Sequence, residues 1–230
     1  MSRRLLAEAQ SGDYERSACE SRITLPPTPR GFGGQVAPSR LRKTVVPNYT
    51  VQIVGYRRNF VPGGTFFFTA TLRDRRSLAL VEHIDALRDS IRQARSERPF
   101  HIDAIVVLPD HLHTIWTLPD GDSNYPARWR RIKSAFTHRL VSSGVALKCD
   151  RRGEYDLWQR RFWEHTVRDD ADFQRCIDYI HFNPVKHGLV ARVSDWEHSS
   201  FRRFVRAGLL SMDWGGHAGP LTGGFGERDE

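Results

Sequence analysis

The chain has 230 residues, of which 39% are apolar and 11% aromatic, and its formal net charge is +8. This composition supports one ordinary folded core and excludes a chain that is disordered throughout. The absence of an apolar run of 18 residues excludes a membrane-spanning helix, so we expect no membrane partner. The surplus of arginine raises the expectation of a nucleic-acid partner. Cys19, Cys149 and Cys176 are far apart and form no CxxC pair, which favours a reducing cytoplasm over a disulfide framework.

Composition divides the chain into three segments. Residues 1–50 mix Pro, Gly and Arg without an apolar period, and we expect a disordered basic arm there. This arm either touches DNA phosphates or is a tail without a role, and the sequence leaves both open. Residues 51–208 hold the periodic segments and should form one folded domain. Residues 209–230 are rich in Gly and predict a flexible tail.

The first half of this domain alternates between strand and helix patterns. Aromatic and β-branched residues predict a strand over 63–74, and apolar spacings of three and four predict a helix over 77–96 with Ser77 as its N-cap. Two further strands over 100–108 and 111–118 flank a Pro-Asp turn. They should form an antiparallel hairpin.

The second half continues with a helix over 125–144, then a fourth strand with its lead-in over 155–167. A helix opening with acidic residues is expected over 169–183, ending before Pro184 because proline disfavours the α conformation in the residue before it. A short helix is possible over 199–208. The order of the first six elements matches the split β-α-β plan, so we expect an α+β fold with a ferredoxin-like antiparallel sheet and helices packed on it.

Two histidines flank one leucine at the start of the strand over 111–118. Because side chains alternate faces along a strand, His111 and His113 point the same way and Leu112 points into the opposite layer. The pair could share a metal ion. It could also be two half-exposed histidines at a strand end, and the pattern alone does not separate the two.

A second group lies on the helix over 169–183. Tyr179 and Asn183 are four residues apart and therefore share one helix face. The amide oxygen of Asn183 is a hard ligand that suits Mg²⁺ or Mn²⁺. Tyr179 would then lie one turn before a metal ligand, where a phenol could attack a phosphate that the metal polarises. The alternative is a tyrosine buried on an amphipathic helix.

Taken together, these pieces resemble the single-tyrosine HUH transposases, and most closely the REP-associated tyrosine transposases. The motif for which the superfamily is named, His-hydrophobic-His, stands here as "HLH" at 111–113. The resemblance covers roughly residues 56–200. It includes "VVLPDHLHTIWTLP" and the long block "WQRRFWEHTVRDDADFQRCIDYIHFNPVKHGLV".

The resemblance implies the fold and the chemistry. It implies a ferredoxin-like fold with the histidine pair on a central strand and the nucleophile on a following helix. Such proteins cut single-stranded DNA beside a hairpin or REP-type palindrome through a 5′-phosphotyrosine, and a 3′-OH then attacks that bond. Tyr179 matches the nucleophile, and His111, His113 and Asn183 match the ligands of one Mg²⁺ or Mn²⁺ ion. REP-associated members are more often monomers, and a bacterial cytoplasmic, nucleoid-associated location is expected.

Further cations are candidates for DNA contact. The densest basic cluster surrounds Trp129, and two more candidates follow the nucleophile; the six residues are Arg128, Arg130, Arg131, Lys133, Lys186 and His187. The cluster on the helix over 125–144 is otherwise the solvated side of an amphipathic helix. Two other functions also remain open: a regulator that binds hairpin DNA without cutting it, and a metallohydrolase that acts on another substrate.

Overall fold

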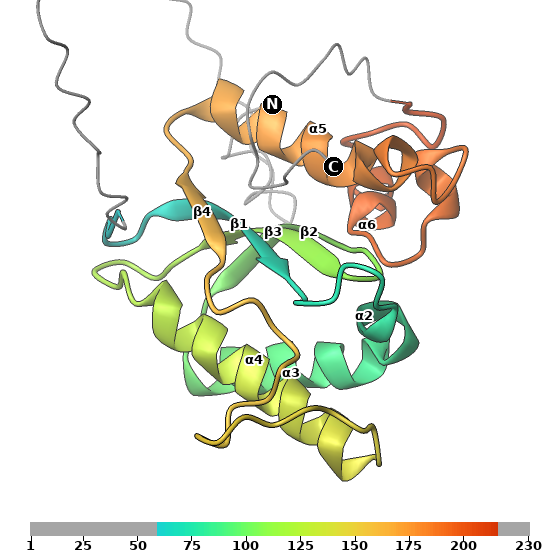
Figure 1. Ribbon diagram of the computed structural model, residues 1–230. Helices are drawn as coiled ribbons and strands as arrows, with labels where there is room; N and C mark the ends of the chain where they lie inside the picture. The colour runs from blue at the N-terminus through green and yellow to red at the C-terminus, as the bar shows by residue number, and fades with distance from the viewer. Residues whose placement is uncertain (1–58, 216–230) are drawn as a thin grey trace, which may run out of the picture. The chain divides into compact units, whose positions relative to one another are not determined.

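The computed structural model describes residues 59–215 and contains a four-stranded antiparallel sheet with helices on both faces (Figure 1). The strand order is β2-β3-β1-β4, which is the order of a ferredoxin-like sheet and confirms the predicted fold class. The strands are β1 (Thr65–Thr71), β2 (His101–Val107), β3 (His111–Thr117) and β4 (Trp163–Thr166). The predicted arm over 1–50 lies outside the described residues, as does the predicted tail from residue 216 onward.

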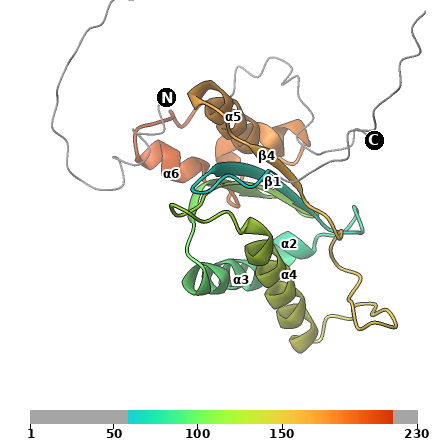
Figure 2. The ribbon, with the colours of Figure 1, turned by 90° about the vertical axis from the view of Figure 1, so that its left-hand side faces the viewer.

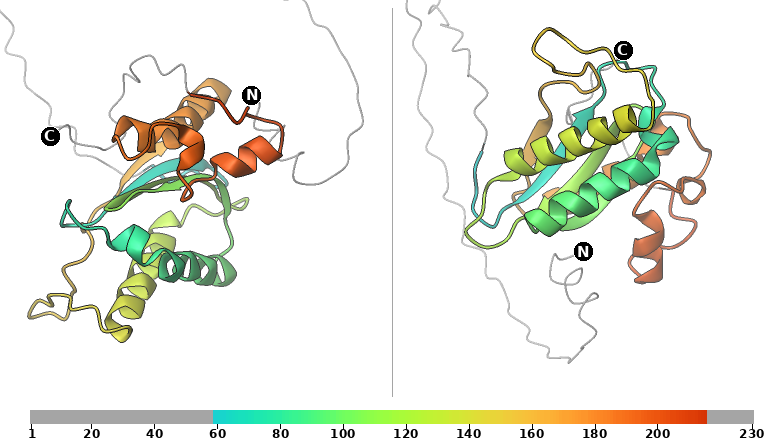
Figure 3. Two further views of the ribbon diagram at one scale, coloured as in Figure 1. Left: turned by 90° about the vertical axis from the view of Figure 1, so that its right-hand side faces the viewer. Right: turned by 90° about the horizontal axis from the view of Figure 1, so that it is seen from below.

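The helices form one layer on each face of the sheet (Figures 2 and 3). One layer holds α3 (Ile84–Glu97) and α4 (Tyr125–Ser142), and the other holds α5 (Asp170–Lys186) and α6 (Phe201–Arg206). The short α2 (Ala79–Glu82) precedes α3, and a 3₁₀ turn, η1 (Val193–Asp195), precedes α6. None of the helices between residues 59 and 215 is long and apolar enough to span a bilayer.

Strand alternation supplies each layer with its own core. Phe66 and Phe68 of β1 are fully buried in the cluster beneath α3 and α4, whereas Phe67 between them is fully buried in the cluster beneath α5. This arrangement follows from the period of two along a strand. Full burial of each phenyl ring contributes about 1.5–3 kcal/mol. A strand buried on both faces explains the continuous apolar run in its sequence.

Side-chain caps fix the start of the two long helices that follow the hairpin. The side chain of Asn124 accepts a hydrogen bond from the amide of Ala127 at the start of α4. The side chain of Asp169 accepts one from the amide of Asp172 at the start of α5, whose first turn is acidic as predicted. Both caps satisfy amides that have no partner inside the helix.

Two predicted elements are divided or shortened in the structure. The helix predicted over 77–96 is interrupted at His83, where α2 turns so that Leu80 is buried and its amide donates to the carbonyl of Pro109. Ser77 is not the N-cap residue, although its hydroxyl accepts from the amide of Ala79. Only residues 163–166 of the strand predicted over 155–167 form a continuous ladder with β1. The preceding segment buries Trp158 and Phe162 and meets the end of β1 at an isolated bridge between Trp158 and Leu72.

The end predicted for α5 is wrong. The helix continues through Pro184 to Lys186, although proline was expected to stop it at Asn183. Proline removes only its own amide donor, and near the C-terminus that loss affects one bond. The carbonyl of Asn183 still accepts from His187, and the carbonyl of Pro184 accepts from Leu189. The extra turn places Lys186 and His187 beside the predicted nucleophile.

Candidate active site

The two histidines of β3 face α5 from the centre of the sheet. His111 pairs with Thr71 and His113 pairs with Thr69 across the β1–β3 ladder. Both imidazoles are buried, with 1% and 0% of their surface exposed, and their ring centroids lie 4.9 Å apart. Leu112 between them packs into the core on the opposite face, as predicted from strand alternation.

Each imidazole is oriented by a hydrogen bond through its Nδ1 atom. The Nδ1 atom of His111 lies 2.8 Å from a carboxylate oxygen of Asp110, and that of His113 lies 2.9 Å from the hydroxyl of Thr69. A carboxylate accepts, so His111 donates through Nδ1 and its Nε2 atom carries the lone pair. Such outer partners fix the tautomer and ring orientation of histidines that bind metals. Nε2 is therefore the atom that His111 would offer to an ion.

Asp110 is held as a carboxylate. Burial raises the pKa of its carboxyl group, but the hydrogen bond from His111 and the charge of Arg75 outweigh this effect, and the pKa lies below its ordinary value. The guanidinium of Arg75 lies 2.9 Å from the second carboxylate oxygen. Asp110 thus supplies a negative charge directly behind the histidine pair.

Helix α5 places three side chains along one stripe above these histidines. Tyr179, Asn183 and His187 recur every four residues, so they follow one face of the helix. The ring of Tyr179 lies 5.1 Å from that of His113, and the ring of His187 lies 5.2 Å from that of His111. Asn183 stands between these two contacts and is 1% exposed. Its amide therefore faces the histidine pair.

A lysine lies beside the candidate nucleophile. The Nζ atom of Lys186 lies 3.4 Å from the hydroxyl oxygen of Tyr179 and 5.1 Å from the centre of its ring. The phenol is otherwise enclosed, with 4% of the residue exposed and the ring of Phe67 5.9 Å away. The lysine is itself exposed, so its charge is placed where a phosphate from solvent would arrive.

The basic cluster predicted to contact DNA lies on the other side of the sheet, on α4, and one of its members is buried. Arg128 is 1% exposed, and its guanidinium donates to the carbonyls of Arg98, Pro99 and Asn124 and to the carboxylate of Asp122. This placement corrects the expectation that Arg128 faces DNA, because its donors are already used to join α4 to the loops around it.

The other three members of the cluster on α4 differ in their exposure and in their partners. Arg131 forms a two-pronged pair with Glu97 of α3, and Lys133 donates to the carbonyl of Gln159. Arg130 is exposed and lines a cavity. Lys186 and His187 lie at the histidine pair, as described above. The structure therefore brings Tyr179, His111, His113, Asn183, Lys186 and His187 together and separates them from the cluster on α4 by the sheet.

Sequence reasoning missed the two residues that orient the histidines. Asp110 could have been found, since it directly precedes the pair in "PDHLH" and an acidic neighbour is a common partner of a ligating histidine. Thr69 offered no such signal, because its position depends on the register between β1 and β3.

The sequence and the structure of the chain were compared with those of known proteins, and both comparisons found similar proteins. No family model matches. The chain is 46% identical to the REP-associated tyrosine transposase of Escherichia coli (strain K12) over 169 residues, which cover 74% of this chain and 95% of that protein. It is 44% identical to a putative REP-associated tyrosine transposase of Haemophilus influenzae over 70% of this chain and 93% of that protein.

A solved structure agrees with these relatives. It shows a REP-associated tyrosine transposase bound to a REP hairpin, with a TM-score of 0.67 and 46% sequence identity. The match covers 76% of this chain and 98% of that chain. Its fold corresponds to the four-stranded sheet and two helical layers described above. The chain belongs to the family of REP-associated tyrosine transposases.

Proposed function

We propose that this protein cuts and rejoins single-stranded DNA beside hairpins of the REP type, using Tyr179 as the nucleophile. The observation that carries the proposal is the position of the Tyr179 ring 5.1 Å from that of His113, with Asn183 on the same helix face. The similarity to a transposase bound to a REP hairpin supports the choice of DNA.

The donor set fits one divalent ion. His111 and His113 would contribute imidazole nitrogens and Asn183 an amide oxygen, which leaves coordination positions for phosphate oxygens and water on Mg²⁺ or Mn²⁺. When bound, the ion would withdraw charge from the scissile phosphate and stabilise the oxygens that become negative. Asp110 and Thr69 would hold the imidazoles in the required orientation.

The chain's own residues would carry the bond changes. The Tyr179 oxygen forms a bond to phosphorus, the bond from phosphorus to the 3′ oxygen breaks, and the phenol loses its proton while the leaving oxygen gains one. The products are a 5′-phosphotyrosine and a 3′-OH. Lys186 would stabilise the charge that develops on the phenol oxygen and on the phosphate bonded to it, because its Nζ atom lies 3.4 Å from that oxygen. A 3′-OH from a second strand reverses the exchange and frees Tyr179.

Tyr179 and the histidine pair lie together within one chain, with the rings of Tyr179 and His113 5.1 Å apart. A site built in this way would not need a residue from a second copy. This arrangement supports a protein that acts as a monomer. Size-exclusion chromatography with light scattering, with and without hairpin DNA, measures the oligomeric state directly.

A labelled hairpin oligonucleotide with single-stranded flanks tests the function. Incubation with Mn²⁺ or Mg²⁺ should give a covalent protein–DNA adduct that is resolved on a denaturing gel and lost in Tyr179→Phe. Hairpin binding without an adduct under either metal would instead show a regulator that does not cut DNA. Activity that survives Tyr179→Phe but not His113→Ala would show a metallohydrolase of another kind.

A further inference from the structure

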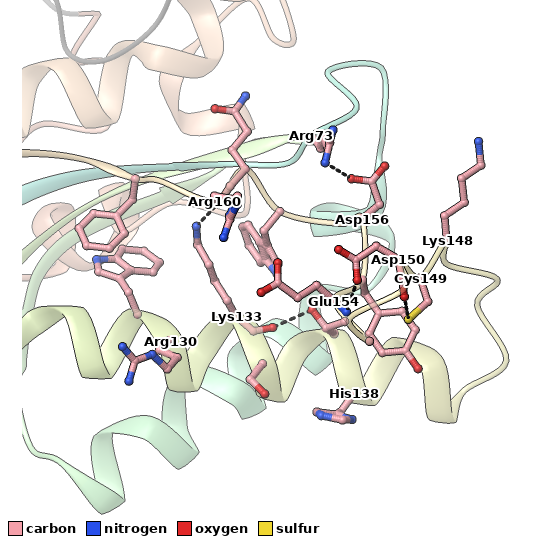
Figure 4. A pocket seen from close by; sticks show the side chains of 18 of the residues that line it. Arg73, Arg130, Lys133, His138, Lys148, Cys149, Asp150, Glu154, Asp156 and Arg160 are labelled. Carbon is pink, nitrogen blue, oxygen red and sulfur yellow. Dashed lines mark hydrogen bonds and ion pairs between the residues drawn. The ribbon is translucent and has the colours of Figure 1, made fainter.

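A cavity lies on the side of the sheet opposite the histidine pair. Its volume is about 800 Å³, and it is enclosed by α4 and the segment 148–162 that precedes β4 (Figure 4). This volume falls in the range of about 300–1,000 Å³ that is typical of small-ligand sites. None of the six residues gathered at Tyr179 lines it, so the proposed reaction does not account for it.

Cations without partners surround the cavity. Arg130 projects from α4, and Lys148 and Arg160 project from the 148–162 segment (Figure 4). None of the three side chains forms an ion pair or hydrogen bond with any residue between 59 and 215. Three arginine or lysine heads around one cavity favour a ligand with negative charge, and the planar guanidinium suits phosphate in particular.

The walls of the cavity are aromatic and carry buried donors. Trp129 and Trp158 both line it, with 1% and 9% of their surface exposed, and the indole nitrogen of each has no acceptor among the described residues. Both nitrogen atoms are inaccessible from the cavity, so a ligand would contact the rings rather than these donors. Tyr155 and Phe162 complete the aromatic lining. These surfaces suit a flat ring.

One carboxylate distinguishes the ligand from a bare anion. Asp156 pairs with Arg73, and Asp150 accepts from two backbone amides, but the carboxylate of Glu154 has no partner between residues 59 and 215. A carboxylate would repel a free phosphate. It would accept hydrogen bonds from the exocyclic amine of a nucleobase. Cations, aromatic walls and this acid together match a nucleotide.

We propose that this cavity binds one unpaired nucleotide of the DNA, with the base between the aromatic walls and its phosphate at Arg130 and Arg160. The inference rests on the proposed function for its substrate class, single-stranded or hairpin DNA. The unpaired nucleotide could lie in the flank of the hairpin or within the hairpin itself. The chemistry of binding is the same in both cases. The position in the oligonucleotide that cross-links to the cavity distinguishes the two.

The edge of the sheet connects the cavity to the reaction site. Phe162 lines the cavity, and the next residue, Trp163, belongs to the edge strand β4 and faces α5. The Trp163 ring lies 5.8 Å from that of Phe67, which contacts Tyr179. A DNA strand that passes the β4 edge would therefore reach both places, one from each face of the sheet.

Photo-cross-linking tests the placement. The probe is a hairpin oligonucleotide with single-stranded flanks in which one thymidine at a time is replaced by 5-iodo-deoxyuridine. Full-length Tyr179→Phe protein is irradiated with it in EDTA, so that cleavage plays no part. Cross-links from one position to the tryptic peptide 153–160 or to Phe162 support the proposal, and that position identifies the flank or the hairpin as the source. Cross-links confined to other peptides overturn it.

Charge reversal gives an independent measurement. Arg130→Glu and Arg160→Glu should each weaken hairpin binding about tenfold and lower the dependence of log affinity on log salt concentration by about 0.7, as expected for one lost contact to a single-stranded phosphate. Arg88→Glu on α3 makes the same charge change outside the cavity and serves as the control. Equal affinities for all three variants overturn the proposal.

The outcomes separate this inference from the proposed function. An adduct at Tyr179 without cross-links at the cavity overturns the proposal that the cavity binds a nucleotide and leaves the proposed function intact. Cross-links at the cavity without an adduct support the cavity and contradict cleavage. Failure to bind hairpin DNA at all overturns both.

Discussion

Lys186 and Tyr179 are brought together by a helix that continues past a proline: the lysine Nζ atom lies 3.4 Å from the phenol oxygen. Lys186→Met should slow adduct formation about ten- to a hundredfold, because a cation that stabilises developing charge is removed from the reacting oxygen. Single-turnover rates with Mn²⁺ measure the effect. Lys186→Arg should recover most of the rate, and hairpin affinity should change much less than the rate. Equal rates for Met and wild type would show that the lysine only covers the ring.

Removal of the carboxylate behind the histidine pair should weaken metal binding. Asp110→Asn keeps the shape of the side chain but removes the charge that orients His111. We expect the affinity for Mn²⁺ to fall about 10- to 100-fold, as is typical when an outer partner of a metal ligand is lost. Calorimetric titration of the protein with Mn²⁺ measures this without any DNA. Unchanged affinity would mean that the ion, if bound, does not use His111.

Acid should destabilise the fold through His181. This residue is fully buried against Phe201 and Phe204, and burial lowers the pKa of its imidazole to about 3, from 6.5 in an unfolded chain. The unfolded state therefore binds the extra proton below pH 6.5, and the free energy of unfolding falls as the pH drops from 6.5 toward 3. The loss is about 2 kcal/mol at pH 5, from about 1.36 kcal/mol per pH unit.

Denaturant unfolding at pH 7 and pH 5 measures this loss. His181→Gln should show a smaller decrease between the two values, whatever its stability at pH 7. His198, whose pKa is also lowered by burial, contributes equally to both proteins and cancels in the comparison. Parallel decreases in wild type and variant would assign the acid sensitivity to other groups.

Substitution of two nearby arginines of α4 should change stability by very different amounts. Arg128→Met leaves the Asp122 carboxylate and three backbone carbonyls without their donor, and we expect the free energy of unfolding to fall by about 3–5 kcal/mol. Arg130→Met should change it by less than about 0.5 kcal/mol, because the side chain is exposed and has no partner among the described residues. Thermal unfolding of the two variants, side by side, distinguishes them. Equal stability would contradict the buried role of Arg128.

Much of the fold, and the side of each element on which the candidate site residues lie, could be predicted from the sequence. Strand alternation was sufficient to place His111 and His113 on one face and Leu112 on the other, and helix periodicity joined Tyr179 to Asn183. Both rules describe neighbours along one element, so they need no knowledge of packing. That these two elements face each other came from the family resemblance, and the structure agrees with it.

Contacts between elements were harder to predict. Arg128 recurs at spacings of four with Ile132 and Phe136, so helix periodicity alone puts it on the apolar face of α4. Charge density in the sequence nevertheless suggested a DNA-facing residue, because a local count of arginines does not show which one points inward. The partner of His113 and the path of residues 148–162 depend on strand register and on loop packing, neither of which has a local signal.

The alternation in β3 also makes the reaction conditional on complete folding. A shift of one residue in the pairing of β3 with β1 would send Leu112 toward α5 and turn both imidazoles into the core beneath α3 and α4. Burying two imidazoles there would be strongly unfavourable, so the register that builds the core is the register that builds the site. The proposed cleavage site would therefore be absent from a partly assembled chain and would form only when β3 pairs with β1 in the correct register.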